Sequence, residues 1–132
     1  MFTSIDIRSS HKVQMMDITE KISGLIAKAG ISEGVCVVYT PHTTAGITIN
    51  ENADPDVKKD IIKGLDDIVS ENLGYCHCEG NSPAHIKSSL IGFSEQIIVA
   101  DGRLLLGTWQ GIYFCEFDGP RSRKVYVKVI EG

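Results

Sequence analysis

The chain has 132 residues, of which 42% are hydrophobic and 23% charged, a composition typical of one globular domain with its own core. Its formal net charge of −4 excludes a strongly basic surface, so we expect neither nucleic acid nor a membrane as a partner. The N-terminal residues lack the basic and apolar segments of a signal peptide, and the four cysteines are then free thiols. We therefore expect one soluble, cytoplasmic domain over residues 1–132.

The first half of the chain alternates strand and helix signals. The run from Gly34 to Thr40 is apolar at nearly every position, which predicts a strand buried on both faces with Cys36 in the core. Asp54 and Pro55 suit a helix cap and the first helical position, and an apolar stripe follows them. We expect strands at 2–7, 13–16, 34–40 and 47–50, a helix over 18–29 before Gly30, and a second helix from Pro55 to before Gly74.

A third, short helix is predicted over 83–91, in the stretch richest in histidine, cysteine and serine. Asn81 or Ser82 caps its start, and Gly92 follows its end. The first turn has unpaired N–H groups and positive partial charge, which suits a phosphate and keeps His85 neutral. Helical spacing places His85, Ser88 and Ser89 on one face, whereas Ile86 and Leu90 are expected to face the core.

The last part of the chain predicts antiparallel strands. Asp101-Gly102 is a hairpin signal between strands at 94–99 and 104–106, and a final strand alternates over 124–130. The strand 112–117 is apolar at its even and its odd positions, and hence on both faces. We therefore expect one of these faces to meet another subunit. The element order indicates an α+β fold with an antiparallel, sandwich-like core, two main helices and one short helix.

Three polar segments share the character of a binding site. Imidazoles in the first two of these segments suit zinc or a similar metal, and guanidiniums in the third suit a phosphate. A lone tryptophan among them either stacks on a flat heterocycle or belongs to the core. The segments are His42-Thr43-Thr44 with Asn50-Glu51, His77 with Asn81 and His85, and Trp109-Gln110 with Arg121 and Arg123.

The same segments resemble a known family, the secondary thiamine-phosphate synthases, also called YjbQ-like. The matching motifs occur in order over nearly the whole chain: Pro41–Gly46, Asn50–Pro55, Gly80-Asn81 with Ala84–Ile86, Gly107–Gly111 and Glu116–Arg121. The resemblance implies an α+β protein with a β-sandwich core, assembled as a homotrimer with sites near the subunit interfaces. It also implies a weak activity that joins a pyrimidine pyrophosphate to a thiazole phosphate and releases pyrophosphate.

The resemblance and the residue chemistry together give the expected roles. A divalent metal, zinc or magnesium, is expected as cofactor, and a small phosphorylated metabolite is expected as partner. His42, His77, His85 and Glu51 are the expected catalytic residues, and the three histidines are also the expected metal ligands. Substrate or phosphate binding is expected from Thr43, Thr44, Asn50, Asn81, Ser88, Trp109, Gln110 and Arg121.

Two other functions remain open from the sequence. One is a non-catalytic trimer that binds a metal or a phosphorylated metabolite, and the other is a metal-dependent hydrolase with Glu51 as base. Cys76 and Cys78 flank His77 outside the family motifs, and they are either part of a metal cluster or incidental exposed thiols. His11 is expected to be a surface turn residue without a role.

Overall fold

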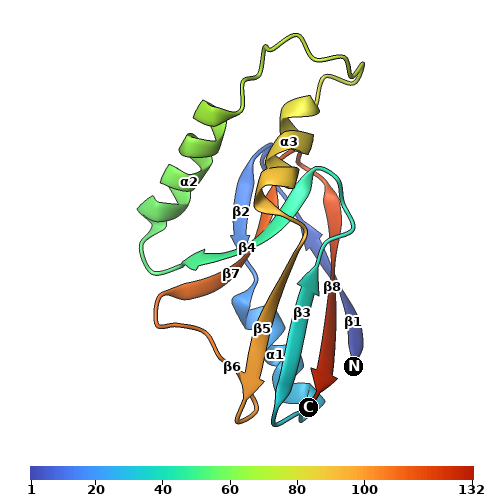
Figure 1. Ribbon diagram of the computed structural model, residues 1–132, viewed down its shortest axis with the longest axis vertical. Coiled ribbons are helices and arrows are strands. Elements are labelled where there is room, and N and C mark those ends of the chain that lie inside the picture. The colour runs from blue at the N-terminus through green and yellow to red at the C-terminus, as the bar shows by residue number, and fades with distance from the viewer.

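The computed structural model describes residues 1–132 and shows two antiparallel sheets and three helices, the expected α+β fold (Figure 1). The five-stranded sheet has the order β1 (Phe2–Arg8), β8 (Ser122–Glu131), β3 (Gly34–Tyr39), β5 (Ser94–Ala100) and β6 (Arg103–Leu104). The three-stranded sheet has the order β2 (Gln14–Asp17), β7 (Gln110–Glu116) and β4 (Ala45–Glu51). The helices are α1 (Thr19–Ala29), α2 (Pro55–Ile68) and α3 (Ser82–Ile91).

The main core lies between the two sheets and includes the buried face of α1. Ile22 and Ile26 of α1 meet Val127 of β8 and Phe114 of β7 in one cluster of buried apolar side chains. In Figure 1, α1 lies behind the lower end of the sheets, whereas α2 and α3 lie at the upper end. No helix of the protein combines the length and the apolar character needed to cross a bilayer.

Strand β7 is buried on both faces within the chain. Ile112 and Phe114 belong to the main core, whereas Tyr113, Cys115 and Phe117 belong to a second cluster that contacts α2 and α3. The prediction that strand 112–117 meets another subunit is therefore wrong, because elements of the same chain cover both of its faces. Both faces of β7 are apolar because it is a middle strand that lies between two cores.

Strand β3 was expected to be buried on both faces, and this expectation is wrong. Cys36 and Val38 are fully buried, but Val35 and Val37 on the opposite face are only half-buried, and Tyr39 is exposed. The outer face of the five-stranded sheet carries a row of aromatic rings in contact. The ring centroids of Phe2 and Tyr126 are 5.6 Å apart, those of Tyr126 and Tyr39 6.1 Å, and those of Tyr39 and Phe93 5.8 Å.

Helix α2 begins as its cap predicts, and helix α1 ends as predicted. The Asp54 carboxylate accepts a hydrogen bond of 2.9 Å from the Asp56 N–H at the start of α2. The Asp17 carboxylate accepts from the Thr19 N–H, also at 2.9 Å, and Gly30 ends α1 with a φ of 65°, which glycine adopts without strain. Helix α2 ends at Ile68, several residues before Gly74.

Helix α3 is rotated relative to the expectation. Its buried side chains are Pro83, Ala84, Lys87 and Ser88, whereas Ile86 and Leu90 are exposed, so the predicted core face is wrong. Polar contacts decide this orientation. The Lys87 ammonium pairs with a carboxylate of α2, and the Ser88 hydroxyl donates to the carbonyl oxygen of Ala45 at 2.6 Å. Asn81 precedes the helix without a side-chain capping bond.

Candidate functional site

A polar cleft of about 400 Å³ lies where the loop between β3 and β4, the loop before α3 and the start of β8 meet. This volume falls in the range of about 300–1,000 Å³ that is usual for small-molecule sites. None of the residues lining the cleft is hydrophobic, so it suits a charged or strongly polar ligand. The lining residues are Pro41, His42, Thr43, Thr44, His77, Glu79, Asn81, His85, Arg121 and Arg123.

The cleft brings together most of the predicted site residues. The three histidines line it along with Thr43, Thr44, Asn81 and Arg121, although these residues come from three separate segments of the chain. Ser88 lies beside the cleft, in an adjoining hollow that it shares with His42, Thr43 and His85. His11 lies outside the cleft, as expected, and its Nδ1 is 2.9 Å from the hydroxyl of Ser10.

Four predicted residues lie elsewhere in the chain. Asn50, Glu51, Trp109 and Gln110 are where the end of β4 pairs with the start of β7, and none of them lines the cleft. A strand rises about 3.4 Å per residue, so this end of β4 is roughly 20 Å from its cleft end. Trp109 is 63% exposed, so the core alternative for its ring is wrong. Within one chain, Glu51 cannot act as a base in the cleft.

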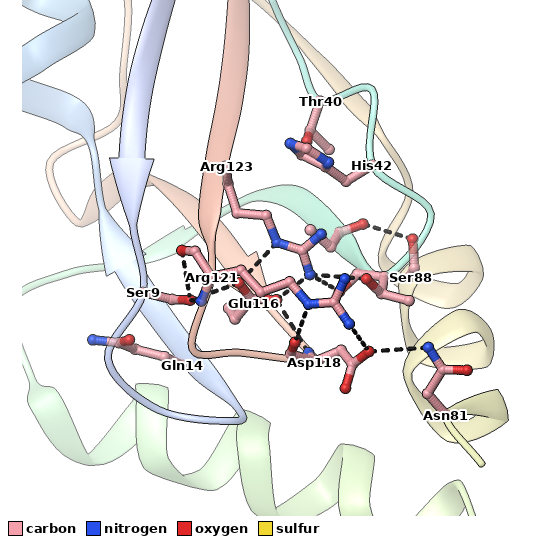
Figure 2. A network of polar contacts seen from close by, with 12 residues as sticks. Ser9, Gln14, Thr40, His42, Asn81, Ser88, Glu116, Asp118, Arg121 and Arg123 are labelled. Atoms are coloured by element: carbon pink, nitrogen blue, oxygen red, sulfur yellow. Dashed lines mark hydrogen bonds and ion pairs between the residues drawn. The ribbon is translucent and has the colours of Figure 1, made fainter. Parts of the chain in front are cut away.

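The inner wall of the cleft is a buried ion pair between Arg123 of β8 and Glu116 of β7 (Figure 2). The Arg123 Nε donates to Glu116 Oε1 at 2.8 Å, and its Nη2 pairs with the second carboxylate oxygen. The same Nη2 donates to the Thr44 hydroxyl at 2.8 Å. The Ser9 hydroxyl donates to Glu116 Oε1 at 2.7 Å. The pair therefore joins four segments of the chain beneath the cleft.

Burial on its own would raise the pKa of the Glu116 carboxyl. Hydrogen bonds from Arg123, Ser9 and the Asp118 N–H, together with the Arg123 charge, instead hold this pKa below its usual value. The carboxylate is therefore ionised whenever the protein is folded near neutral pH. Sequence reasoning grouped Arg123 with Arg121 but gave it no role, and it missed Glu116. A signal was present, because Arg123 takes the inward position of the series that continues with Val125 and Val127.

The rim of the cleft carries a second, more exposed pair, Arg121 with Asp118. The Arg121 Nε donates to the Asp118 carbonyl oxygen at 2.8 Å, and its Nη2 donates to Asp118 Oδ2 at 2.6 Å. The same Oδ2 accepts from the Asn81 amide at 3.0 Å. A Cβ at position 119 would lie 2.6 Å from the Ser9 hydroxyl oxygen, so glycine is needed for this turn to pack on the inner wall.

The rim leaves several groups available to a ligand. The Nη1 of Arg121 makes no hydrogen bond in the chain, so the outer edge of the guanidinium is free. The Asn81 Oδ1 is buried and has no hydrogen-bond partner, which makes it an acceptor that a ligand can satisfy. The start of α3 offers less than the sequence indicated, because the N–H groups of Ala84 and His85 already bond to the Asn81 carbonyl oxygen.

The histidines of the cleft have different surroundings. His42 Nε2 accepts a hydrogen bond of 2.9 Å from the backbone N–H of Lys124. Burial lowers the pKa of His42, and the charges of Arg123 and Arg121 lower it further, against an opposing effect of Glu116. His77 and His85 contact each other at right angles, with ring centroids 5.5 Å apart.

The cleft does not have the geometry of a metal site. No group of three or more histidine, cysteine, aspartate or glutamate side chains could hold a metal ion, so the predicted three-histidine site is not supported. The donor chemistry agrees with this, because the Nε2 lone pair of His42 is already engaged by the backbone. Cys76 and Cys78 are exposed free thiols, and the alternative metal cluster around His77 is likewise not supported.

Comparison with known proteins identifies the family. The family model described as UPF0047 protein YjbQ-like matches residues 3–132. The chain belongs to the YjbQ-like UPF0047 family. A UPF0047 protein of Methanocaldococcus jannaschii is 54% identical over 98% of this chain and 94% of its own length. The UPF0047 protein YugU of Bacillus subtilis is 51% identical over 98% of this chain and 99% of its own.

Solved structures of the YjbQ-like family have the same fold. A YjbQ/UPF0047 protein from Clostridium acetobutylicum, described as uncharacterized, is 55% identical, with a TM-score of 0.95 over 97% of this chain and 99% of its own. A protein from Sulfolobus solfataricus, described as YbjQ-like and of unknown function, is only 28% identical. Its TM-score is nevertheless 0.96 over all of this chain and 97% of its own. The family likeness therefore establishes the fold and no reaction.

Proposed function

We propose that the cleft binds the phosphate group of a small phosphorylated metabolite. The observation that carries this proposal is that Arg121 and Arg123 both line one cleft that has no hydrophobic lining. A guanidinium can donate two parallel hydrogen bonds to a phosphate, and such charge-assisted bonds are stronger than neutral ones. The outer edge of Arg121 and the hydroxyl of Thr43, which also lines the cleft, would make these contacts.

The charges of the cleft favour directed hydrogen bonds over a strong positive field. Each arginine is already paired with a carboxylate, and Glu79 adds a further negative group to the lining. A ligand is then recognised by where its oxygens lie more than by its total charge. The unpartnered Asn81 Oδ1 requires a donor, so we infer that the ligand also carries a hydroxyl or amino group near its phosphate.

The proposed reaction is that of the secondary thiamine-phosphate synthases, in which a pyrimidine pyrophosphate is joined to a thiazole phosphate and pyrophosphate is released. The departing pyrophosphate gains negative charge, which donors fixed in advance stabilise. His77 and His85 are available for proton transfer because no hydrogen bond of the chain engages their rings. The cleft of one chain has no apolar wall for a heterocycle, so this part of the substrate would need a surface from a neighbouring subunit.

We also propose a homotrimer, with the outer face of the five-stranded sheet as the subunit interface. Phe2 and Phe93 at the ends of the aromatic row are 61% and 62% exposed, and Ile98 and Ile130 on the same face are 58% and 53% exposed. Exposed apolar surface of this kind usually marks an interface. Sedimentation equilibrium at micromolar concentration should give three times the chain mass, and a stable monomer would contradict this assembly.

Calorimetric titration and a product assay test the function. We expect the protein to bind inorganic phosphate, pyrophosphate and thiamine phosphate, and to release pyrophosphate when both substrates are supplied. Binding without pyrophosphate release would favour the non-catalytic phosphometabolite-binding protein. Release of inorganic phosphate from a phosphate ester would favour the hydrolase. Failure to bind any of the three ligands would show that the cleft is not a phosphate site.

A further inference from the structure

The protonation state of His42 is determined by its backbone partner. The Lys124 N–H can only donate, so the Nε2 of His42 must accept with its lone pair at the observed 2.9 Å. A neutral imidazole carries one proton, which then lies on Nδ1. A hydroxyl or carboxyl partner would allow the ring to exchange tautomers, whereas a peptide N–H does not lose its proton. His42 is therefore held as the Nδ1–H tautomer.

The surroundings of His42 also disfavour the imidazolium. A second ring proton on Nε2 would point at the Lys124 N–H and break that hydrogen bond. The charged groups within range are Arg123 and Arg121, which oppose the imidazolium, and Glu116, which favours it but is already paired. Asp6, Arg8 and Lys124 line a second hollow that His42 also borders, and there Asp6 and Lys124 pair with each other.

The other two histidines of the cleft lack this constraint. The rings of His77 and His85 contact each other and make no hydrogen bond with the chain, so no backbone group fixes their tautomers. His77 comes from an exposed loop and His85 from the first turns of α3, and both face the same cleft as His42. The cleft thus holds one histidine whose tautomer is fixed by the chain and two whose tautomers are not.

We propose that His42 is a fixed hydrogen-bond donor, which presents Nδ1–H to an oxyanion in the cleft, and that proton transfer there belongs to His77 and His85. This inference rests on the proposed function for the identity of the acceptor, but the tautomer follows from the chain alone. With Arg121 and Arg123, His42 forms a wall that can only donate. Such a wall recognises the deprotonated oxygens of a phosphate.

Nitrogen-15 NMR of the ligand-free wild-type protein tests the tautomer. Long-range proton–nitrogen correlations distinguish a protonated ring nitrogen from an unprotonated one, and a His42→Gln variant assigns the signals. We expect His42 to show protonated Nδ1 and unprotonated Nε2 from pH 8 down to about pH 6.5, the usual histidine pKa. An Nε2–H tautomer, or an imidazolium at His42 within this pH range, would overturn the inference.

Two substitutions test the donor role with inorganic phosphate as the ligand. Asparagine places its amide group near the position of Nδ1, whereas glutamine reaches the position of Nε2. His42→Asn retains a donor toward the cleft and should keep the phosphate affinity within about threefold of wild type. His42→Gln retains the acceptor for the Lys124 N–H but loses the cleft donor, so its affinity should fall about tenfold, the equivalent of one hydrogen bond.

The two experiments separate failure of this inference from failure of the proposed function. The Nδ1–H tautomer in a wild-type protein that binds no phosphate would overturn the phosphate site and, with it, the oxyanion as acceptor. Phosphate binding with the reverse order, in which His42→Gln binds normally and His42→Asn does not, would show that His42 acts only by bracing β8. Circular dichroism spectra of both variants should match wild type.

Discussion

The two arginine–carboxylate pairs of the cleft have the same chemistry but differ in burial. The side chains of Arg123 and Glu116 are 4% and 0% exposed, whereas those of Arg121 and Asp118 are 50% and 18% exposed. A buried charge that loses its partner cannot be compensated by water, so the inner pair is tied to folding. The rim pair can exchange contacts with water or a ligand. Burial therefore separates a supporting arginine from a binding arginine.

The largest expected effect is the loss of the inner pair. Glu116→Gln keeps the shape of the side chain but leaves the Arg123 charge buried without a counterion, which should destabilise the fold by about 3–5 kcal/mol. Urea denaturation should show a lower midpoint with an unchanged slope. The matched control is Glu131→Gln at the exposed end of β8, which should stay within about 0.5 kcal/mol of wild type. Equal stabilities would show that the inner pair is not tied to folding.

Acid should weaken the same pair. Hydrogen bonding to Arg123, Ser9 and the Asp118 N–H holds the pKa of Glu116 below 4.5, against the raising effect of burial. A carboxyl whose pKa is lower in the folded state stabilises the fold above pH 4.5, and this contribution is lost as the pH falls further. The free energy of unfolding of wild type should therefore decline below pH 4.5, and Glu116→Gln should decline less steeply. Parallel acid profiles would contradict this assignment.

Local signals predicted the start of α2 and the end of α1, because a cap involves only neighbouring residues. Asp54 and Pro55 determine where α2 begins regardless of tertiary structure. The grouping of His42, His77 and His85 was predicted from the motif resemblance and from their positions at element ends. Tertiary contacts determined what the pattern did not. Lys87 of α3 is buried only because it pairs with a carboxylate of α2. With Lys87 on the buried face of the helix, Ile86 is turned outward.

The sequence analysis assigned the residues at both ends of β4 to one site, whereas the structure separates them within a chain. His42-Thr43-Thr44 and Asn50-Glu51 are close in sequence, but an extended strand carries them to opposite ends. Periodicity also does not say what covers a sheet face. Strand β7 is apolar on both faces because it is a middle strand between two cores. Strand β3 is also apolar on both faces, but one of them is only half-covered.

The next effect concerns binding and not folding. Arg121→Lys keeps the charge at the rim but loses the planar edge that holds two phosphate oxygens. Pyrophosphate affinity should weaken by about 1–3 kcal/mol, as expected for the loss of charge-assisted hydrogen bonds. The stability should change by less than about 1 kcal/mol, because the arginine is half-exposed. Calorimetric titration and urea denaturation measure the two quantities.

Arg103→Lys is the matched control for the rim. Arg103 is exposed in β6, which pairs with the end of β5 that is remote from the cleft, so neither affinity nor stability should change. Equal pyrophosphate affinities of Arg121→Lys and wild type would show that Arg121 is only a turn residue. A large loss of stability in Arg121→Lys would show that the rim pair supports the fold as the inner pair does.

The smallest effect is expected at a third and more exposed pair beside the cleft, Lys124 with Asp6. Their charged atoms are 2.8 Å apart, yet the side chains are 54% and 85% exposed, so water and salt screen the attraction. The hydrogen bond from Lys124 lowers the pKa of Asp6, so any stabilisation exists above its usual pKa of 3.8 and is lost below it. At pH 7 in physiological salt, Asp6→Asn should therefore leave the urea midpoint unchanged.

The substitution should also leave the His42 tautomer unchanged, because His42 contacts the Lys124 backbone and not its ammonium. A shift in either quantity would mean that this exposed pair holds β8 in place, and that stability is not graded by burial around this cleft.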